Sequence, residues 1–129
     1  MGTDVRMIFV RADLLEAAGI DPATFQPTSW AELLDAARQI KEASPDSFPL
    51  QLNAGVPMGE ATTMQGVLPM LVGTGAEVWA DDMWIGSTEE LGEVLDLYRT
   101  IYIDEELGDP ILQQEAAGRD TSFLSLIHI

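Results

Sequence analysis

Residues 55–65 (GVPMGEATTMQ) are the best candidates for chemistry in this sequence, and the chemistry they favour is ligand binding. The hydroxyls of Thr62 and Thr63 and the amide of Gln65 can hydrogen-bond sugar hydroxyls without the cost of burying a charge. Glu60 adds a carboxylate that can accept two hydrogen bonds from a diol. An apolar helix is expected to begin here, and its first N–H groups lack intrahelical partners. The alternative is a solvated loop in which Thr62 or Thr63 caps that helix.

Catalysis that depends on histidine or cysteine, and ordinary zinc sites, are excluded by the residue types present. The chain has no cysteine, and its one histidine, His128, lies in the terminal stretch 124–129. That stretch, LSLIHI, is also one reading frame of the mosaic-end adapter used in transposase-based DNA library preparation. We therefore interpret 124–129 as a non-native tail. Without a trusted histidine or cysteine, neither a Ser-His-Asp triad nor a zinc site can form, and we expect no catalytic residue, metal or cofactor.

Acidic residues and glycines are abundant but are not spaced for a known site. The runs at 81–82 and 104–106 lack the alternating spacing of a calcium loop, so we interpret them as a solvated turn and a helix end. The sequence does not place two carboxylates at the fixed separation that glycoside hydrolysis requires. Gly73 and Gly75 lack the third glycine and the preceding strand of a dinucleotide site.

The aromatic residues favour packing over binding. Trp79 and Trp84 have flat apolar faces that can stack on a sugar ring. Because they are separated by a tight turn, we expect them instead to anchor a hairpin on the helices. Trp30 opens the apolar face of a helix and is predicted to be a core residue. Tyr98 and Tyr102 share one helix face and are interpreted as core or rim residues.

The charge excludes two classes of partner. The 129 residues include 6 Lys+Arg and 22 Asp+Glu, which gives a formal net charge of −16. This charge argues against nucleic acid, whose binding depends on Lys and Arg replacing counterions, and against anionic membrane surfaces. The longest apolar runs are too short to span a bilayer. The 47% of apolar residues is enough to build a core.

The predicted elements are mostly helices. Apolar residues at 91, 94, 95, 98, 101 and 102 have helical spacing, and Ser29 and Ser87 each begin an S-x-x-E capping box. Pro69 is expected to kink its helix. Few strands are predicted for so many helices, so we expect the partner strands to lie in sequence outside this chain. Helices are expected at 11–18, 30–43, 62–72, 89–103 and 110–117, strands at 4–10 and 48–53, and a hairpin at 78–85.

Two motifs on either side of a proline-containing loop carry a resemblance to a known family. They resemble K-D-L-x-x-x-A-G-I and T-W-x-E-L-x-x-A of the extracellular solute-binding proteins of sugar ABC transporters, the maltose-binding-protein-like class. The resemblance covers residues 4–123, and the later order of elements also fits. Val10-Arg11 stands where the family has Tyr-Asn, and Ser29 is inserted in the second motif. The matching residues are Asp13, Leu14, Ala18, Gly19 and Ile20, then Thr28, Trp30, Glu32, Leu33 and Ala36 or Ala37.

The resemblance implies an α/β fold with two lobes, periplasmic-binding-protein-like and of type II. Residues 1–123 would form a helix-rich part of one lobe. It implies a non-enzymatic component of an ABC importer that binds a carbohydrate in the interlobe cleft, with Glu60, Thr62, Thr63 and Gln65 on the cleft wall. The implied partners are the carbohydrate and the permease subunits. The implied location is extracellular or periplasmic, with a lipid anchor. A two-carboxylate glycoside hydrolase and a helical interaction module remain open as alternatives.

Overall fold

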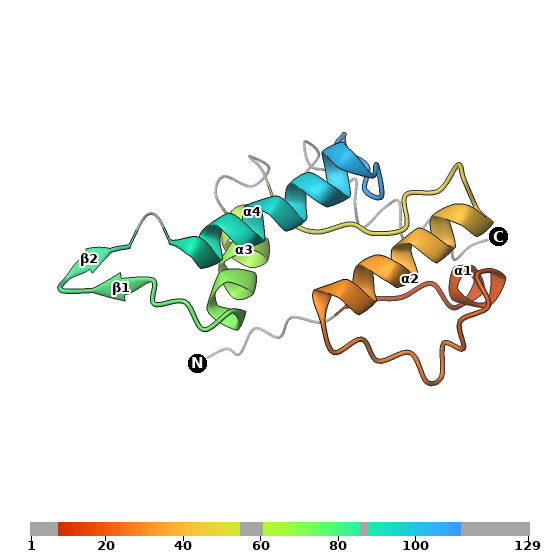
Figure 1. Ribbon diagram of the computed structural model, residues 1–129, viewed down its shortest axis with the longest axis horizontal. Helices are drawn as coiled ribbons and strands as arrows, with labels where there is room; N and C mark the ends of the chain where they lie inside the picture. The colour runs from red at the N-terminus through yellow and green to blue at the C-terminus, as the bar shows by residue number, and fades with distance from the viewer. Residues whose placement is uncertain (1–7, 55–60, 86–87, 112–129) are drawn as a thin grey trace. The chain divides into compact units, whose positions relative to one another are not determined.

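A computed structural model describes residues 8–54, 61–85 and 88–111. The chain divides into two compact units, Met1–Pro49 and Leu50–Ile129, and Figure 1 shows the helices and strands of both. Helices predominate in both units, and the described ranges contain a single two-stranded sheet. Among these ranges, no helix combines the length and the apolar character needed to cross a bilayer.

The first unit consists of a short helix, α1 (Ala12–Ala17), packed on a longer one, α2 (Trp30–Ala43). Gly19, with φ of 78°, ends α1, because the left-handed region is open to glycine without penalty. The Ile20 N–H reaches back to the Leu15 carbonyl at 2.8 Å, which completes a Schellman motif. The buried apolar residues of this unit are Leu15, Ala36, Ala37 and Ile40. Trp30, predicted to be in the core, is only partly buried.

The predicted cap of α2 is confirmed in its main feature. The Ser29 hydroxyl accepts a hydrogen bond from the Glu32 N–H at 3.2 Å. The Glu32 carboxylate reaches one residue further back than in the usual capping box and accepts from the Thr28 N–H at 2.7 Å. The entry of the chain into α2 is therefore fixed by two local hydrogen bonds.

The second unit begins with an extended segment, followed by α3 (Ala61–Gly73) and a small hairpin. Helix α3 is continuous across Pro69. Strands β1 (Trp79–Ala80) and β2 (Met83–Trp84) pair antiparallel, with Trp79 opposite Trp84. Asp81 and Asp82, with φ of 51° and 58°, form the turn, which is the left-handed pair that a two-residue hairpin loop requires. The predicted hairpin and its turn are confirmed.

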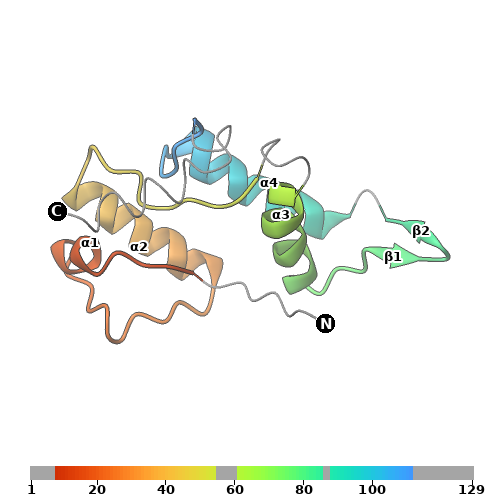
Figure 2. The same cartoon turned by 180° about the vertical axis from the view of Figure 1, so that it is seen from behind.

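Helix α4 (Glu89–Arg99) packs on α3 and continues into a π-helical turn, η1 (Thr100–Asp104) (Figure 2). Its cap is Thr88, whose hydroxyl accepts from the Leu91 N–H at 3.1 Å; the predicted cap Ser87 lies outside the described residues. The buried face also differs from the prediction, because Leu97 is 6% exposed whereas Leu95 is 53% exposed. The buried apolar residues of this unit are Leu50, Val94, Leu97, Ile101 and Leu107.

Two predicted strands are not found in the described residues. Residues 8–10 and the whole of 48–53 have no strand assignment, while 4–7 lie outside the described ranges. The segment 48–53 has strand-like alternation, but a strand needs a neighbouring strand to share its backbone hydrogen bonds. Here the backbone of Leu52 and Asn53 is bonded by tyrosine side chains instead. The helix predicted at 110–117 falls almost entirely outside the described residues.

Candidate functional site

Two of the predicted binding residues, Thr63 and Gln65, lie in the first turns of α3. Helix α3 begins at Ala61, with no acidic residue in its first turn. Thr63 and Gln65 are both partly buried there. The Gln65 amide makes no hydrogen bond with the described residues, so it can bond a ligand. The structure describes the backbone of Thr62 within α3 but not its side chain, and Glu60 lies outside the described residues.

Leu52 and Asn53, which precede α3 in the chain, are bonded by two tyrosines from α4 and η1. The Tyr98 hydroxyl donates to the Asn53 carbonyl at 2.6 Å. The Tyr102 hydroxyl accepts from the Leu52 N–H at 2.8 Å and donates to the Leu52 carbonyl at 2.9 Å. The two rings stack with their centroids 6.2 Å apart. Two side chains thus bond consecutive residues of an extended segment that has no strand beside it in the described ranges.

The same segment is also bonded at its beginning. The Leu50 N–H donates to the Leu107 carbonyl at 3.0 Å. The Gln51 side chain exchanges two hydrogen bonds with the backbone of Asp109, at 3.1 Å and 3.3 Å. Residues 50–53 are therefore bonded one after another to α4, η1 and the residues that follow η1.

Burial raises the pKa of the Tyr98 phenol well above its usual value, and the neighbouring Tyr102 adds to the shift. A phenol with a raised pKa keeps its proton over the whole physiological range. Tyr98 can therefore act as the hydrogen-bond donor that the Asn53 carbonyl requires.

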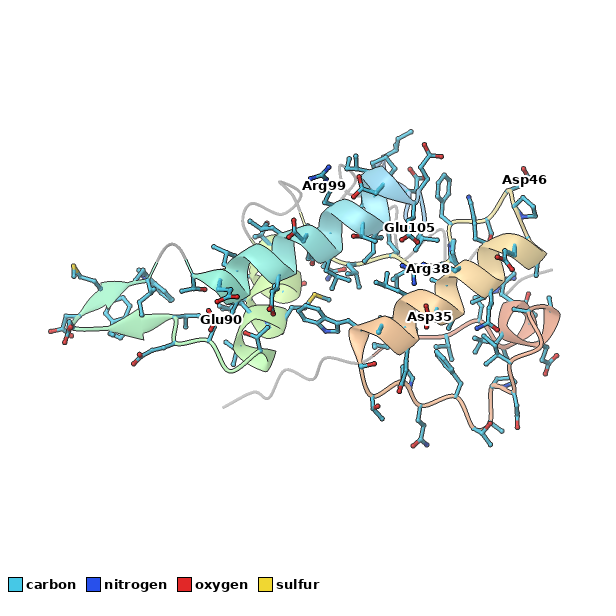
Figure 3. The ribbon with its side chains drawn as sticks, in the orientation of Figure 1. Asp35, Arg38, Asp46, Glu90, Arg99 and Glu105 are labelled. Carbon is cyan, nitrogen blue, oxygen red and sulfur yellow. The ribbon has the colours of Figure 1, made fainter. Side chains whose placement is uncertain are left out.

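The first unit has a shallow depression between the 20–27 loop and α2, but its carboxylates are already bonded. Asp21 accepts from the Ala23 N–H at 2.9 Å. Glu32 accepts from Thr28, and Asp35 pairs with Arg38 at 2.7 Å, both on α2 (Figure 3). Each of these carboxylates is already used in a turn, in the cap of α2 or in an ion pair on α2. This depression is therefore a weaker candidate site than the start of α3. It is lined by Ile20, Asp21, Thr24, Phe25, Gln26, Pro27, Glu32, Asp35, Ala36 and Gln39.

Charged side chains elsewhere in the described residues form surface pairs. Arg99, labelled in Figure 3, lies 3.4 Å from Asp104. Arg11 bonds Asp13, and this hydrogen bond lowers the pKa of the Asp13 carboxyl. A general acid for glycoside hydrolysis needs the opposite shift, so Asp13 does not fit that role. Within the described ranges, no group of three or more acidic or histidine side chains could hold a metal ion.

The two hairpin tryptophans do not occupy the place that the sequence predicted. Their rings meet edge to face, with centroids 5.0 Å apart. Trp79 is 47% exposed and Trp84 is 66% exposed. They pack on each other across the hairpin and leave much of their surface in solvent, so they do not anchor it as buried residues would.

The sequence pattern predicts core or rim positions for Tyr98 and Tyr102 and does not reveal that their hydroxyls bond residues 52 and 53. Their spacing of four residues placed them correctly on one face of α4 and η1. A buried tyrosine hydroxyl usually finds a polar partner, which was the available signal. The partners lie 45 and 50 residues away in the chain, so the pattern could not name them.

Comparison with known families identifies the chain. Residues 1–124 match the model of the family described as bacterial extracellular solute-binding protein. The match spans nearly the whole chain, so the protein belongs to this family, as the two motifs predicted. Membership indicates a substrate-binding role in transport, an extracellular or periplasmic location and a periplasmic-binding-protein-like fold. Searches of curated proteins and of solved structures find no significant match.

Proposed function

We propose that this chain is part of a receptor that binds a carbohydrate and delivers it to an ABC importer, without covalent chemistry. The receptor would work by closing two lobes on the ligand, with residues 1–123 contributing to one lobe and 124–129 being a non-native tail. A lipid anchor in the complete protein would hold it at the membrane. Its transport partners would be the permease subunits.

The observation that carries the proposal is the polar but uncharged character of the start of α3. Gln65 has an amide without a partner in the described residues, and Thr63 lies one turn before Gly66 on the same helix. Neutral donors and acceptors of this kind suit sugar hydroxyls, because they can be desolvated at lower cost than charges. With Glu60 and Thr62 they form the proposed binding set: Glu60, Thr62, Thr63 and Gln65.

Calorimetry on the complete receptor with a panel of mono- and oligosaccharides tests this site. Gln65→Ala and Glu60→Ala should each weaken binding of the best sugar, by about twofold to tenfold for the loss of one neutral hydrogen bond and more for the carboxylate. Thermal stability should change little, because neither substitution removes a buried apolar group.

Gln39→Ala is the matched control, since Gln39 is an exposed glutamine on α2 and lines the depression of the first unit. It should leave affinity unchanged. If Gln39→Ala weakens binding while Gln65→Ala and Glu60→Ala do not, the site lies in the first unit and our assignment is wrong. Product analysis with the same sugar separates a receptor, which returns it intact, from a two-carboxylate hydrolase, which cleaves it.

A further inference from the structure

The extended segment Leu50–Ala54 receives hydrogen bonds of an unusual kind for a strand-like stretch. Its backbone is bonded by side-chain hydroxyls, with Tyr98 on the Asn53 carbonyl and Tyr102 on both the N–H and the carbonyl of Leu52. A single hydroxyl can serve both groups because it is a donor and an acceptor. The two tyrosines therefore supply hydrogen bonds to Leu52 and Asn53 of the kind that a neighbouring strand would make.

The two hydroxyls belong to residues on either side of the point where α4 passes into the π-helical turn η1. Tyr98 belongs to α4 and Tyr102 to η1, where the Glu105 N–H bonds the Thr100 carbonyl at 3.0 Å across five residues. Such turns are rare and occur frequently at functional sites. Gly108 follows, and a Cβ there would lie 2.4 Å from the Tyr102 ring and 2.7 Å from the Leu50 carbonyl. The absence of a side chain at Gly108 therefore allows Tyr102 and Leu50 to lie close to it.

Helix α3 contacts the same segment through Gly66. A Cβ at this position would lie 1.8 Å from the Asn53 carbonyl oxygen, which is the atom that accepts the Tyr98 hydrogen bond. Gly66 is buried, directly follows Gln65 and lies one turn after Thr63. The position of the first turns of α3 therefore depends on where Tyr98 and Tyr102 hold Leu52 and Asn53.

We propose that Tyr98 and Tyr102 are positioning residues for ligand binding, which act by holding Leu52 and Asn53 against Gly66 and so fix the place of Thr63 and Gln65. This inference rests on the proposed function for its ligand. The claim that the tyrosines hold the segment against α3 rests on the contacts alone. Neither tyrosine needs to touch the sugar. A loss of either hydroxyl would loosen the start of α3 and lower the affinity of a site formed by other residues.

The test uses Tyr98→Phe and Tyr102→Phe in the complete receptor, with and without the sugar that calorimetry selects. Each substitution keeps the ring and its stacking but removes the hydroxyl. Backbone hydrogen exchange measured without sugar should become faster for residues 63–66. The dissociation constant should rise about threefold to tenfold, as expected for one hydrogen bond. Thr88→Ala is the control, because it removes a hydroxyl from the same helix at its cap, away from the segment.

A double-mutant cycle separates positioning from a general loss of stability. If the tyrosines act through α3, the effects of Tyr102→Phe and Gln65→Ala on affinity should be non-additive, whereas those of Thr88→Ala and Gln65→Ala should add. Unchanged exchange at 63–66 in both tyrosine variants would overturn the inference, whatever the sugar does. Faster exchange with unchanged affinity would overturn it too.

A failure of the proposed function is visible separately. In that case Gln65→Ala and Glu60→Ala would leave affinity unchanged in the otherwise wild-type receptor. The exchange rates would then still report whether the tyrosines hold α3, but the inference that they position a sugar site would be wrong together with the site.

Discussion

Gly66 and Gly92 are both inside helices, where glycine costs about 0.5–1 kcal/mol relative to alanine. Their surroundings are opposite. A Cβ at Gly66 would lie 1.8 Å from the Asn53 carbonyl oxygen, whereas a Cβ at Gly92 would meet nothing within 4 Å. The absence of a side chain is therefore a steric requirement at Gly66 and has no steric reason at Gly92.

Alanine substitutions at these two glycines should change stability in opposite directions. Gly92→Ala should raise the free energy of unfolding by about 0.5–1 kcal/mol, because alanine loses less backbone entropy in a helix. Gly66→Ala should lower it by about 1–3 kcal/mol, because α3 must move away from the segment. Urea denaturation of the complete receptor measures both. A stabilising effect of Gly66→Ala would show that α3 does not approach Asn53 as closely as described.

Conformations that depend only on sequence neighbours were predictable from the sequence. Hydrogen bonds between residues far apart in the chain were not. Gly19 at the end of α1 and Asp81-Asp82 at the hairpin turn follow from rules that involve only their neighbours. The bonds of Tyr98 and Tyr102 to residues 52 and 53 depend on how remote parts of the second unit pack. Of the candidate site, the sequence predicted the residue types but not what holds them in place.

At the scale of elements, the hairpin of β1 and β2 is stabilised mainly within itself. It has two residues in each strand, and both aspartates of its turn have left-handed backbone conformations. The pair of Trp79 and Trp84 lies directly across the strands and meets edge to face, a geometry favourable for aromatic rings. Trp79 is 47% exposed and Trp84 is 66% exposed, so we expect the contact between the two rings to account for much of what each contributes to the hairpin.

A double-mutant cycle of Trp79→Ala and Trp84→Ala should therefore show a coupling of about 0.5–1.5 kcal/mol. Each single substitution should cost much less than the roughly 3–5 kcal/mol of a buried tryptophan. Thermal or urea denaturation of the complete receptor provides the free energies. Single losses in the range for buried tryptophans, with no coupling, would indicate that each ring packs on other elements, as the sequence first predicted.

Elements with local signals, the helices and the hairpin, were predicted well, whereas the strand predicted at 48–53 was wrong. Helix α2 follows from a cap and an apolar face, both of which are local signals. A strand is defined by its partner, and the alternation in residues 48–53 could not supply one. On α4 and η1, Val94 and Ile101 are buried as predicted, but Leu97 is buried in place of Leu95, because Leu97 also has helical spacing, three residues after Val94 and four before Ile101.

At the scale of the whole molecule, the described residues bury few large apolar side chains. The first unit buries two residues larger than alanine, Leu15 and Ile40, and the second unit buries five. Several large apolar side chains are left exposed: Ile8, Phe9, Met83, Trp84, Ile103 and Ile111 are each more than 60% exposed. Small cores of this kind contribute little against the conformational entropy of the chain, which is of order 1–2 kcal/mol per residue.

We therefore expect the 129-residue chain, expressed alone, to be soluble but loosely packed. Its helices have local caps and should persist, whereas its small cores should not give a cooperative transition. The net charge of −16 opposes association at low salt, so solubility should fall as added salt screens the repulsion. Circular dichroism on heating, binding of a hydrophobic dye and calorimetry with sugars measure these properties. A sharp two-state transition together with micromolar sugar binding by this chain would show that one part of a lobe folds and binds unaided, contrary to the proposed two-lobed mechanism.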